Sequence, residues 1–198
     1  ESIVQNKCHD TAEGSIDITM IGGTPDPVTG LYKYSWTGEL GVNPTSEDQI
    51  NLIPGEYHVE VEDAKGCVWK KSYVMENPDE LDITLDVKNL TCTGASDGSI
   101  TATVTGGKAP YTFKWKDNND VELPTTVEVI SNLPVGTYKV EVEDYLGCVK
   151  TSQAEVTEPT VLTAQVLVKD ISCHSETDGR LEVAATGGTK DYTYAWYL

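Results

Sequence analysis

Apolar and polar residues alternate with a period of two along most of this chain. In residues 99–105, for example, Ile100, Ala102 and Val104 fall on one side and polar residues fall on the other. Such alternation predicts β-strands with one buried face. No stretch has a helical period, and turns that contain glycine or proline separate the segments at short intervals. We therefore expect an all-β chain.

The alternating segments predict a regular series of strands in the middle of the chain. The expected strands cover residues 81–91, 99–105, 111–116, one or two short stretches within 120–131, 137–143 and 149–156. About seven short strands in roughly 80 residues are typical of an immunoglobulin-like Greek-key β-sandwich. The aromatic residues of the third strand are expected to point inward, with Trp115 as the core tryptophan. Leu133, Gly136 and Tyr138 match a tyrosine-corner variant.

The same series of segments recurs along the chain. Residues 59–68 read VEVEDAKGCV and residues 140–149 read VEVEDYLGCV, which are identical at eight of ten positions. Cys92 and Cys173 are 81 positions apart, and a Gly-Gly pair and an aromatic triplet follow each of them. An internal period of about 81 residues predicts a tandem array of repeats.

These spacings divide the chain into a nearly complete repeat, a complete repeat and part of a third. We expect a first repeat at 1–79 with a truncated first strand, a second at 80–159, and the N-terminal half of a third at 160–198. Because both ends fall inside a repeat, the chain is expected to be a segment of a longer array. No flexible linker separates the repeats, so neighbours should abut. The order of the half-repeat should depend on packing against the second repeat.

The charge of the chain excludes some classes of partner. Acidic residues outnumber basic ones by 32 to 14, which gives a formal net charge of −18. Phosphate binding needs clustered lysine and arginine, so neither nucleic acid nor an anionic membrane is an expected partner. No apolar run approaches 20 residues, so we expect no transmembrane segment. The chain has no G-x-S-x-G or Ser-His-Asp pattern, and we predict neither catalytic nor cofactor-binding residues.

A fixed order of short motifs carries a family resemblance. In the second repeat the motifs are C-x-G-x-x-D-G-S-I at 92–100, T-V-T-G-G at 103–107, P-Y-T-F-x-W at 110–115, L-P-x-G-T-Y-x-V-x-V-x-D at 133–144 and L-G-C-V at 146–149. This order resembles the SprB repeat of giant surface adhesins in gliding bacteria, and the resemblance covers nearly the whole chain. The first repeat departs at residues 25–30, where an insertion lengthens a turn. The third departs at residues 190–191, where the proline is missing.

The resemblance implies a location and a function. SprB-type adhesins are exported by a dedicated outer-membrane secretion route, displayed on the cell surface and moved along it by a motor complex. We therefore expect an extracellular, non-enzymatic segment of a surface filament that mediates adhesion and gliding. Its expected partners are neighbouring repeats of the same chain, with surface polysaccharide and the motility machinery as further candidates.

Two other functions remain open. The first is an array of carbohydrate-binding modules, for which Trp69, Tyr145 and Tyr197 are the candidate exposed rings. The second is a set of accessory repeats of a secreted hydrolase.

The five cysteines fall at two kinds of position, and an exported array can keep disulfides. Cys8 and Cys92 lie between the first and second strands of their repeats, whereas Cys67 and Cys148 follow the strand that precedes the last. In a seven-stranded sandwich these two loops lie at opposite ends, too far apart for a disulfide within one repeat. We therefore predict a bond between repeats, Cys8 with Cys148, which leaves Cys67 and Cys92 for cysteines of further repeats.

Other states of the cysteines stay open. If a single short strand joins strands 111–116 and 137–143, the two loops would share an end, and Cys8 would pair with Cys67 and Cys92 with Cys148. Free thiols are the remaining alternative.

Head-to-tail packing would also bring acidic side chains together. Asp10 and Glu13 of the first repeat would approach Glu143 and Asp144 of the second, and carboxylate oxygens are ligands that calcium prefers. Calcium is therefore the one candidate ligand. The competing interpretation is that these acids bond backbone amides of their own turns. Thr11, in the segment Asp-Thr-Ala, resembles an O-glycosylation acceptor.

Overall fold

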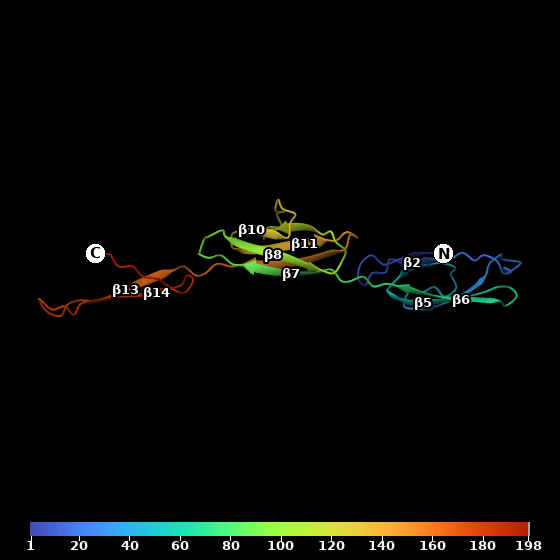
Figure 1. The fold of residues 1–198 in the computed structure, drawn as a ribbon, viewed down its shortest axis with the longest axis horizontal. Helices are drawn as coiled ribbons and strands as arrows, with labels where there is room; N and C mark the ends of the chain where they lie inside the picture. Colours follow the sequence, from blue (N-terminus) through green and yellow to red (C-terminus); the bar gives the residue numbers. More distant parts are fainter. Residues whose placement is uncertain (198) are drawn as a thin grey trace. The chain divides into compact units, whose positions relative to one another are not determined.

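The structure, a computed structural model, consists of antiparallel strands joined by turns (Figure 1). It describes residues 1–197, so Leu198, the last residue of the predicted third repeat, lies outside the description. The strands form four three-stranded sheets and one two-stranded hairpin. Within residues 1–197 no helix is long and apolar enough to cross a membrane.

The chain forms two compact units that do not coincide with the predicted repeats. The first unit comprises Glu1–Asp82, Val104–Tyr111 and Glu143–Lys150, and the second unit comprises the rest of the chain. The first unit therefore holds the whole of the first repeat together with two turns of the second repeat.

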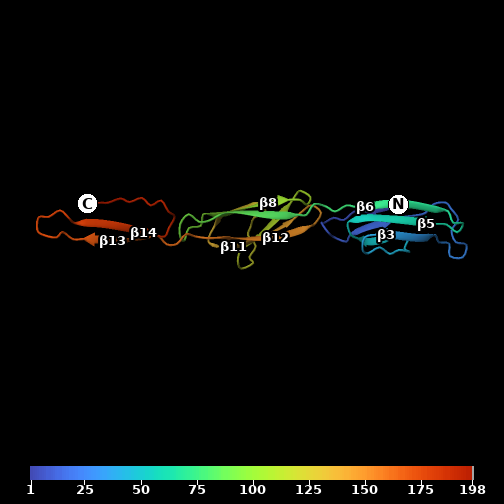
Figure 2. The ribbon, with the colours of Figure 1, turned by 90° about the horizontal axis from the view of Figure 1, so that it is seen from below.

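The first repeat contains six strands in two sheets. One sheet has the order β1-β2-β4 and the other the order β3-β5-β6, formed by β1 (Ser2–Val4), β2 (Gly14–Asp17), β3 (Lys33–Gly38), β4 (Gln49–Leu52), β5 (Gly55–Glu62) and β6 (Val68–Met75). Figure 2 shows β5 between β3 and β6. The chain changes sheet after β2, after β3 and after β4, which is the Greek-key path of an immunoglobulin-like sandwich.

Side chains from both sheets close the core of the first repeat. Ile16 and Leu52 from one sheet pack with Trp36, Tyr57 and Val59 from the other, and all five are at most 2% exposed. Each such side chain contributes about 1.5–3 kcal/mol through burial. The sandwich is therefore held by the inward faces that the alternation predicts.

The second repeat follows the same plan. Its sheets have the orders β7-β8-β10 and β9-β11-β12, formed by β7 (Asp82–Lys88), β8 (Gly98–Thr105), β9 (Thr112–Lys116), β10 (Val129–Leu133), β11 (Gly136–Glu143) and β12 (Val149–Val156). The predicted strand 149–156 is confirmed to the residue. Trp115 is fully buried, as predicted for the core tryptophan.

Each complete repeat has six strands, not the seven or so that the spacing predicts. Between β9 and β10 the carboxylate of Asp117 accepts hydrogen bonds from the amides of Asn119 and Val121, at 2.8 and 3.0 Å. Such local bonds occupy amides that a strand would need for pairing. Within the described residues this stretch pairs through one isolated bridge, between Lys116 and Glu122. The connection therefore crosses the sandwich without a further strand.

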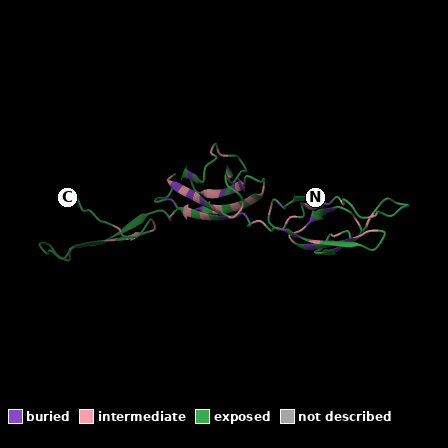
Figure 3. Ribbon diagram, turned by 45° about the vertical axis from the view of Figure 1, so that its right-hand side comes forward, coloured by how far each residue is buried: buried purple, intermediate pink, exposed green. Residues whose placement is uncertain are grey.

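The third copy is a hairpin with little buried surface. Its strands β13 (Thr163–Lys169) and β14 (Arg180–Thr186) pair over seven residues, and every residue of β13 is exposed. The exposed ribbon near the C-terminus is visible in Figure 3. Trp196 is 59% exposed, whereas Trp36 and Trp115 of the first two copies are at most 2% exposed. No second sheet covers this hairpin within residues 1–197.

A tyrosine corner closes each complete repeat. The hydroxyl of Tyr57 donates to the carbonyl of Ile53 at 2.8 Å, and the hydroxyl of Tyr138 donates to the carbonyl of Pro134 at 3.1 Å. In both cases the tyrosine ring is buried on the fifth strand of its repeat, and its hydroxyl bonds to the carbonyl of the residue four positions earlier. The structure thus confirms the tyrosine-corner prediction for residues 133–138.

Replacing Tyr57 with phenylalanine should lower the free energy of unfolding of the first repeat by about 1 kcal/mol. The ring stays in the core, but the carbonyl of Ile53 loses its donor. Urea unfolding measures the change. Tyr145→Phe is the control, because its ring is 70% exposed, and it should change stability by less than about 0.5 kcal/mol. Equal effects of the two substitutions would contradict the assignment.

Candidate functional site

One aspartate organises the turn that carries Cys148. The Oδ1 atom of Asp144 accepts hydrogen bonds from the amides of Leu146 and Cys148, at 2.8 and 2.9 Å. Its Oδ2 atom accepts from the amide of Lys108 at 2.8 Å. The turn needs a residue with positive φ, which Gly147 provides at 88°. The β11–β12 turn therefore presents Cys148 from a fixed backbone.

The turn that carries Cys8 is fixed to the end of its own repeat. The amide of Asp10 donates to Oδ1 of Asn77 at 3.0 Å, and Nδ2 of Asn77 donates to Oδ1 of Asp10 at 2.9 Å. Nδ1 of His9 lies 2.8 Å from the carbonyl oxygen of Pro78, which requires a proton on that nitrogen. The β1–β2 turn is thus held by the segment that follows β6.

A disulfide joins these two turns inside the first compact unit. Cys8 and Cys148 are bonded across 140 positions of sequence, with a Cα–Cα distance of 5.6 Å that is usual for this bond. The structure therefore has the predicted bond between repeats. The alternative pairs within repeats are wrong, because Cys67 and Cys92 are free and exposed, as is Cys173.

Within the first repeat, the turn that carries Cys8 and the turn that carries Cys67 lie far apart, although only one strand lies between β3 and β5 in the sequence. Cys67 precedes β6, whereas the Cys8 turn bonds to Asn77 and Pro78 beyond the other end of β6. The eight residues of β6 span about 26 Å at about 3.3 Å each, far beyond the reach of a disulfide of about 7 Å. The irregular connection 39–48 crosses the sandwich in place of the missing strand, so the two turns keep opposite ends.

The segment between the repeats packs beside the disulfide. The Nζ atom of Lys150 lies 2.7 Å from a carboxylate oxygen of Glu80, and this hydrogen bond raises the pKa of Lys150. A Cβ atom at Gly106 would collide with the carbonyl oxygen of Glu80, and one at Gly107 would press on the buried side chain of Leu81. The Gly-Gly pair is therefore required by the close passage of the chain that enters the second repeat. The Cys8 turn, residues 80–81 and the Cys148 turn together form the junction.

The first repeat contains the same aspartate turn. The Oδ1 atom of Asp63 accepts hydrogen bonds from the amides of Lys65 and Cys67, both at 2.9 Å, and Oδ2 accepts from the amide of Thr24 at 3.0 Å. The bond from the Cys67 amide is the main reason that the pKa of Asp63 lies below its ordinary value. The β5–β6 turn therefore holds Cys67 as its counterpart holds Cys148.

The proposed calcium ligands are not gathered into a metal site within residues 1–197. Asp144 binds amides of its own turn and of a neighbouring turn, and Asp10 binds Asn77. Glu13 is exposed, and Glu143 ends β11. Across residues 1–197 no group of three or more His, Cys, Asp or Glu side chains is placed to hold a metal ion. Calcium binding stays a prediction that this geometry does not favour.

The other predicted surface residues are not gathered into one site. The hydroxyl of Thr11 donates to the carbonyl of Cys8 at 2.8 Å, and its glycosylation stays a prediction. Tyr145 and Tyr197 are well exposed, and Trp69 is 37% exposed. Trp69 lines a shallow hollow together with Tyr32 and Cys67 at one end of the first repeat.

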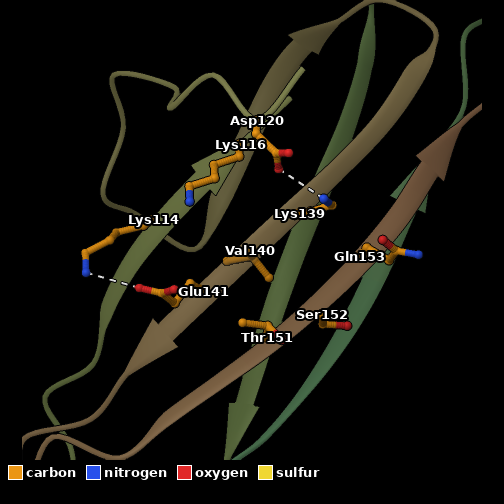
Figure 4. Close-up of a pocket in the computed structure, with 9 residues that line it drawn as sticks. All are labelled: Lys114, Lys116, Asp120, Lys139, Val140, Glu141, Thr151, Ser152 and Gln153. Carbon is orange, nitrogen blue, oxygen red and sulfur yellow. Dashed lines mark hydrogen bonds and ion pairs between the residues drawn. The ribbon is translucent and has the colours of Figure 1, made fainter. Parts of the chain in front are cut away.

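A second hollow, on the outer face of β9, β11 and β12, was not predicted from the sequence (Figure 4). Nζ of Lys114 lies 3.1 Å from Glu141, and Nζ of Lys139 lies 3.0 Å from Asp120. None of the nine lining residues in Figure 4 is aromatic. The polar positions of the alternating pattern could have predicted this polar outer face from the sequence. Its paired charges and missing rings make it a poor platform for a sugar.

Comparison with known proteins identifies the family. The model of the SprB repeat matches residues 1–41, 84–120 and 167–197, which together exceed half of the chain. The chain belongs to the SprB repeat family. Each match covers the first part of one SprB repeat and includes its first cysteine, whereas Cys67 and Cys148 lie outside the matched residues.

Several solved structures are similar to these SprB repeats. The three N-terminal domains of the bacteriophage RB49 highly immunogenic outer capsid protein (Hoc) are 18% identical, with a TM-score of 0.49, over 96% of this chain and 69% of that chain. A Dscam structure that concerns the basis of isoform specificity is 15% identical, with a TM-score of 0.35, over 78% of this chain and 43% of that chain. The amphioxus IgVJ-C2 molecule is 16% identical, with a TM-score of 0.32, over 78% and 99%. No curated protein matches the chain.

Replacing Cys8 with serine should lower the free energy of unfolding of the first unit by about 2–4 kcal/mol, because the bond restricts the unfolded chain. Urea unfolding followed by the fluorescence of the buried Trp36 measures the change. Cys92→Ser removes a free, exposed thiol and should be nearly neutral. Non-reducing peptide mapping that finds Cys8 bonded to Cys67 would contradict the pairing.

Proposed function

We propose that this chain is a structural and adhesive segment of a long extracellular filament that serves adhesion and gliding. The observation that carries the proposal is the covalent bond between successive repeats, Cys8 with Cys148. Disulfides form and persist outside the reducing cytosol. SprB repeats also belong to cell-surface proteins, which supports display on the outer surface.

The position of the bond suits a segment that carries load. When the chain is pulled from its two ends, tension passes from residue 8 to residue 148 through the disulfide. The chain between them, which spans a sequence separation of 140, then adds no length when it unfolds. At about 3.3–3.6 Å per extended residue, about 480 Å of chain is held back. The bond therefore preserves the length of the filament under shear.

The surface chemistry fits a repeated segment better than an enzyme. A net charge of −18 opposes non-specific association between copies of the chain. On the outer face of β9, β11 and β12, charged groups such as Lys114 and Glu141 are paired with each other across strands. In this proposal the partners are neighbouring repeats, with surface polysaccharide and the motility machinery as further partners. A role as accessory repeats of a secreted hydrolase is the competing proposal.

A fluorescent Fab fragment raised against this chain tests the function on live, unpermeabilised cells of the bacterium that produces it. The Fab should label the cell exterior, and the labelled spots should move along the cell while it glides. Deletion of the gene should reduce attachment to glass. Labelling that requires permeabilisation would contradict surface display, and static spots on gliding cells would contradict the role in motility.

One observation favours carbohydrate binding as a second candidate. Trp69 and Tyr32 line the same shallow hollow, and aromatic rings beside a hollow can stack on sugars. If this function is correct, soluble polysaccharide should protect Trp69 from quenching by iodide. Trp69→Ala should remove that part of the fluorescence signal and the binding. Trp196→Ala, at an exposed tryptophan of the third copy, is the matched control, and its equal loss of binding would contradict the site.

A further inference from the structure

The two turns that carry Cys67 and Cys148 match bond for bond. Besides the aspartate bonds already described, the amide of Asp63 donates to the carbonyl of Cys67 at 3.0 Å, and the amide of Asp144 donates to that of Cys148 at 3.0 Å. The backbone bond to the neighbouring turn is also repeated, from Ala64 to Thr24 and from Tyr145 to Lys108, both at 2.8 Å. Cys67 is therefore presented by the backbone geometry that presents a bonded cysteine in the second repeat.

The surface around Cys67 exposes apolar side chains. Ile21 is 93% exposed and Val68 is 52% exposed. Trp69 is 37% exposed and lines a shallow hollow together with Cys67. This face, here called the Cys67 face, comprises Ile21, Gly22, Cys67, Val68 and Trp69.

The chain also has free counterparts of the Cys8 turn. In the Cys8 turn the amide of Thr11 donates to the carbonyl of Cys8 at 3.4 Å, and in the β13–β14 turn the amide of Glu176 donates to that of Cys173 at 3.1 Å. Both cysteines are followed by histidine, and Cys173 is exposed and free. The β13–β14 turn thus has the form of the turn that bonds to Cys148.

We propose that the Cys67 face is a docking surface for the cysteine-bearing β1–β2-type turn of another SprB repeat. A second copy of this chain supplies such a turn at Cys173, and a disulfide between Cys67 and Cys173 then locks the contact. This contact continues the pattern of the junction, where the same two kinds of turn are already bonded. Because the two surfaces differ, the contact is head-to-tail and can extend into open chains.

The bond forms by oxidation of two thiols. Cys67 and Cys173 together release two protons and two electrons. A small disulfide such as oxidised glutathione accepts them and becomes two thiols, by exchange through a mixed disulfide. The Cys8–Cys148 bond is not consumed in this reaction.

The inference goes beyond the proposed function and can be tested without it. One variant carries Cys92→Ser and Cys173→Ser, so that Cys67 is its free thiol, and the other carries Cys67→Ser and Cys92→Ser, so that Cys173 is free. The two variants, with tags of different mass, are mixed in equal amounts in a buffer of oxidised and reduced glutathione. Non-reducing electrophoresis then measures the three dimers. At random, the Cys67–Cys173 dimer would be twice as abundant as each homodimer. Docking predicts that this ratio rises about tenfold above the random value.

A matched pair of substitutions separates docking from chance oxidation. Asp63→Ala removes the bonds that shape the Cys67 turn but keeps the thiol, so the preference for the mixed dimer should fall to the statistical ratio. Asp26→Ala alters an exposed turn that bonds its own residues, and the preference should persist. Trp36 fluorescence checks that both variants are folded.

The outcomes that would overturn the inference are definite. A statistical mixture of dimers with the unmodified turn would remove the docking surface. Retention of the preference in a folded Asp63→Ala variant would assign it to something other than the turn. No preference, together with protection of Trp69 by polysaccharide, would assign the Cys67 face to a glycan instead.

Discussion

The contact between two three-stranded sheets is the interaction on which each complete repeat depends. A sheet this small buries one face, so the inward aromatic rings supply much of the core. Trp36 and Trp115 also use their polar edge: the indole Nε1–H of Trp36 donates to the carbonyl of Ser46, and that of Trp115 to the carbonyl of Val127, both at 2.9 Å. Each acceptor lies in the irregular connection that replaces a seventh strand. The core tryptophan therefore fixes the connection that lets six strands keep the Greek-key path.

At one end of each complete sandwich, a carboxylate takes the place of further hydrophobic burial. Asp63 and Asp144 each bind amides from two turns that are distant in sequence. In the first repeat Asp63 connects the turn after β2 with the turn after β5, and in the second repeat Asp144 connects the turn after β8 with the turn after β11. Such charge-assisted bonds are stronger than bonds between neutral groups. The end of the sandwich is thereby rigid before any partner arrives, and a rigid surface loses less entropy on docking. This explains how a turn of few residues can present a cysteine for bonding.

In the proposed filament the core of each repeat and the junction between repeats have different roles. The core gives each repeat its own stability, and the junction determines whether one repeat can be pulled from the next. The segment through residues 80–81 passes so close to Gly106 that a side chain there has no room, and the disulfide closes beside it. A short connection, a required glycine and a covalent bond thus act at one place. For an adhesive segment this arrangement carries load without a large interface.

The sequence by itself determined the strands, the repeat and the family, because alternation and motif order are local properties of the chain. It also indicated the bond between Cys8 and Cys148, although it left two other states open. The number of strands was overestimated, because the Asp117 turn uses amides that alternation alone would assign to pairing. Only the tertiary structure decided the cysteine pairing, since the turn with Cys8 and the turn with Cys67 lie beyond opposite ends of β6. The tertiary structure also decided the role of Asp144, because its oxygen atoms accept hydrogen bonds from amides that meet only when two distant turns fold together.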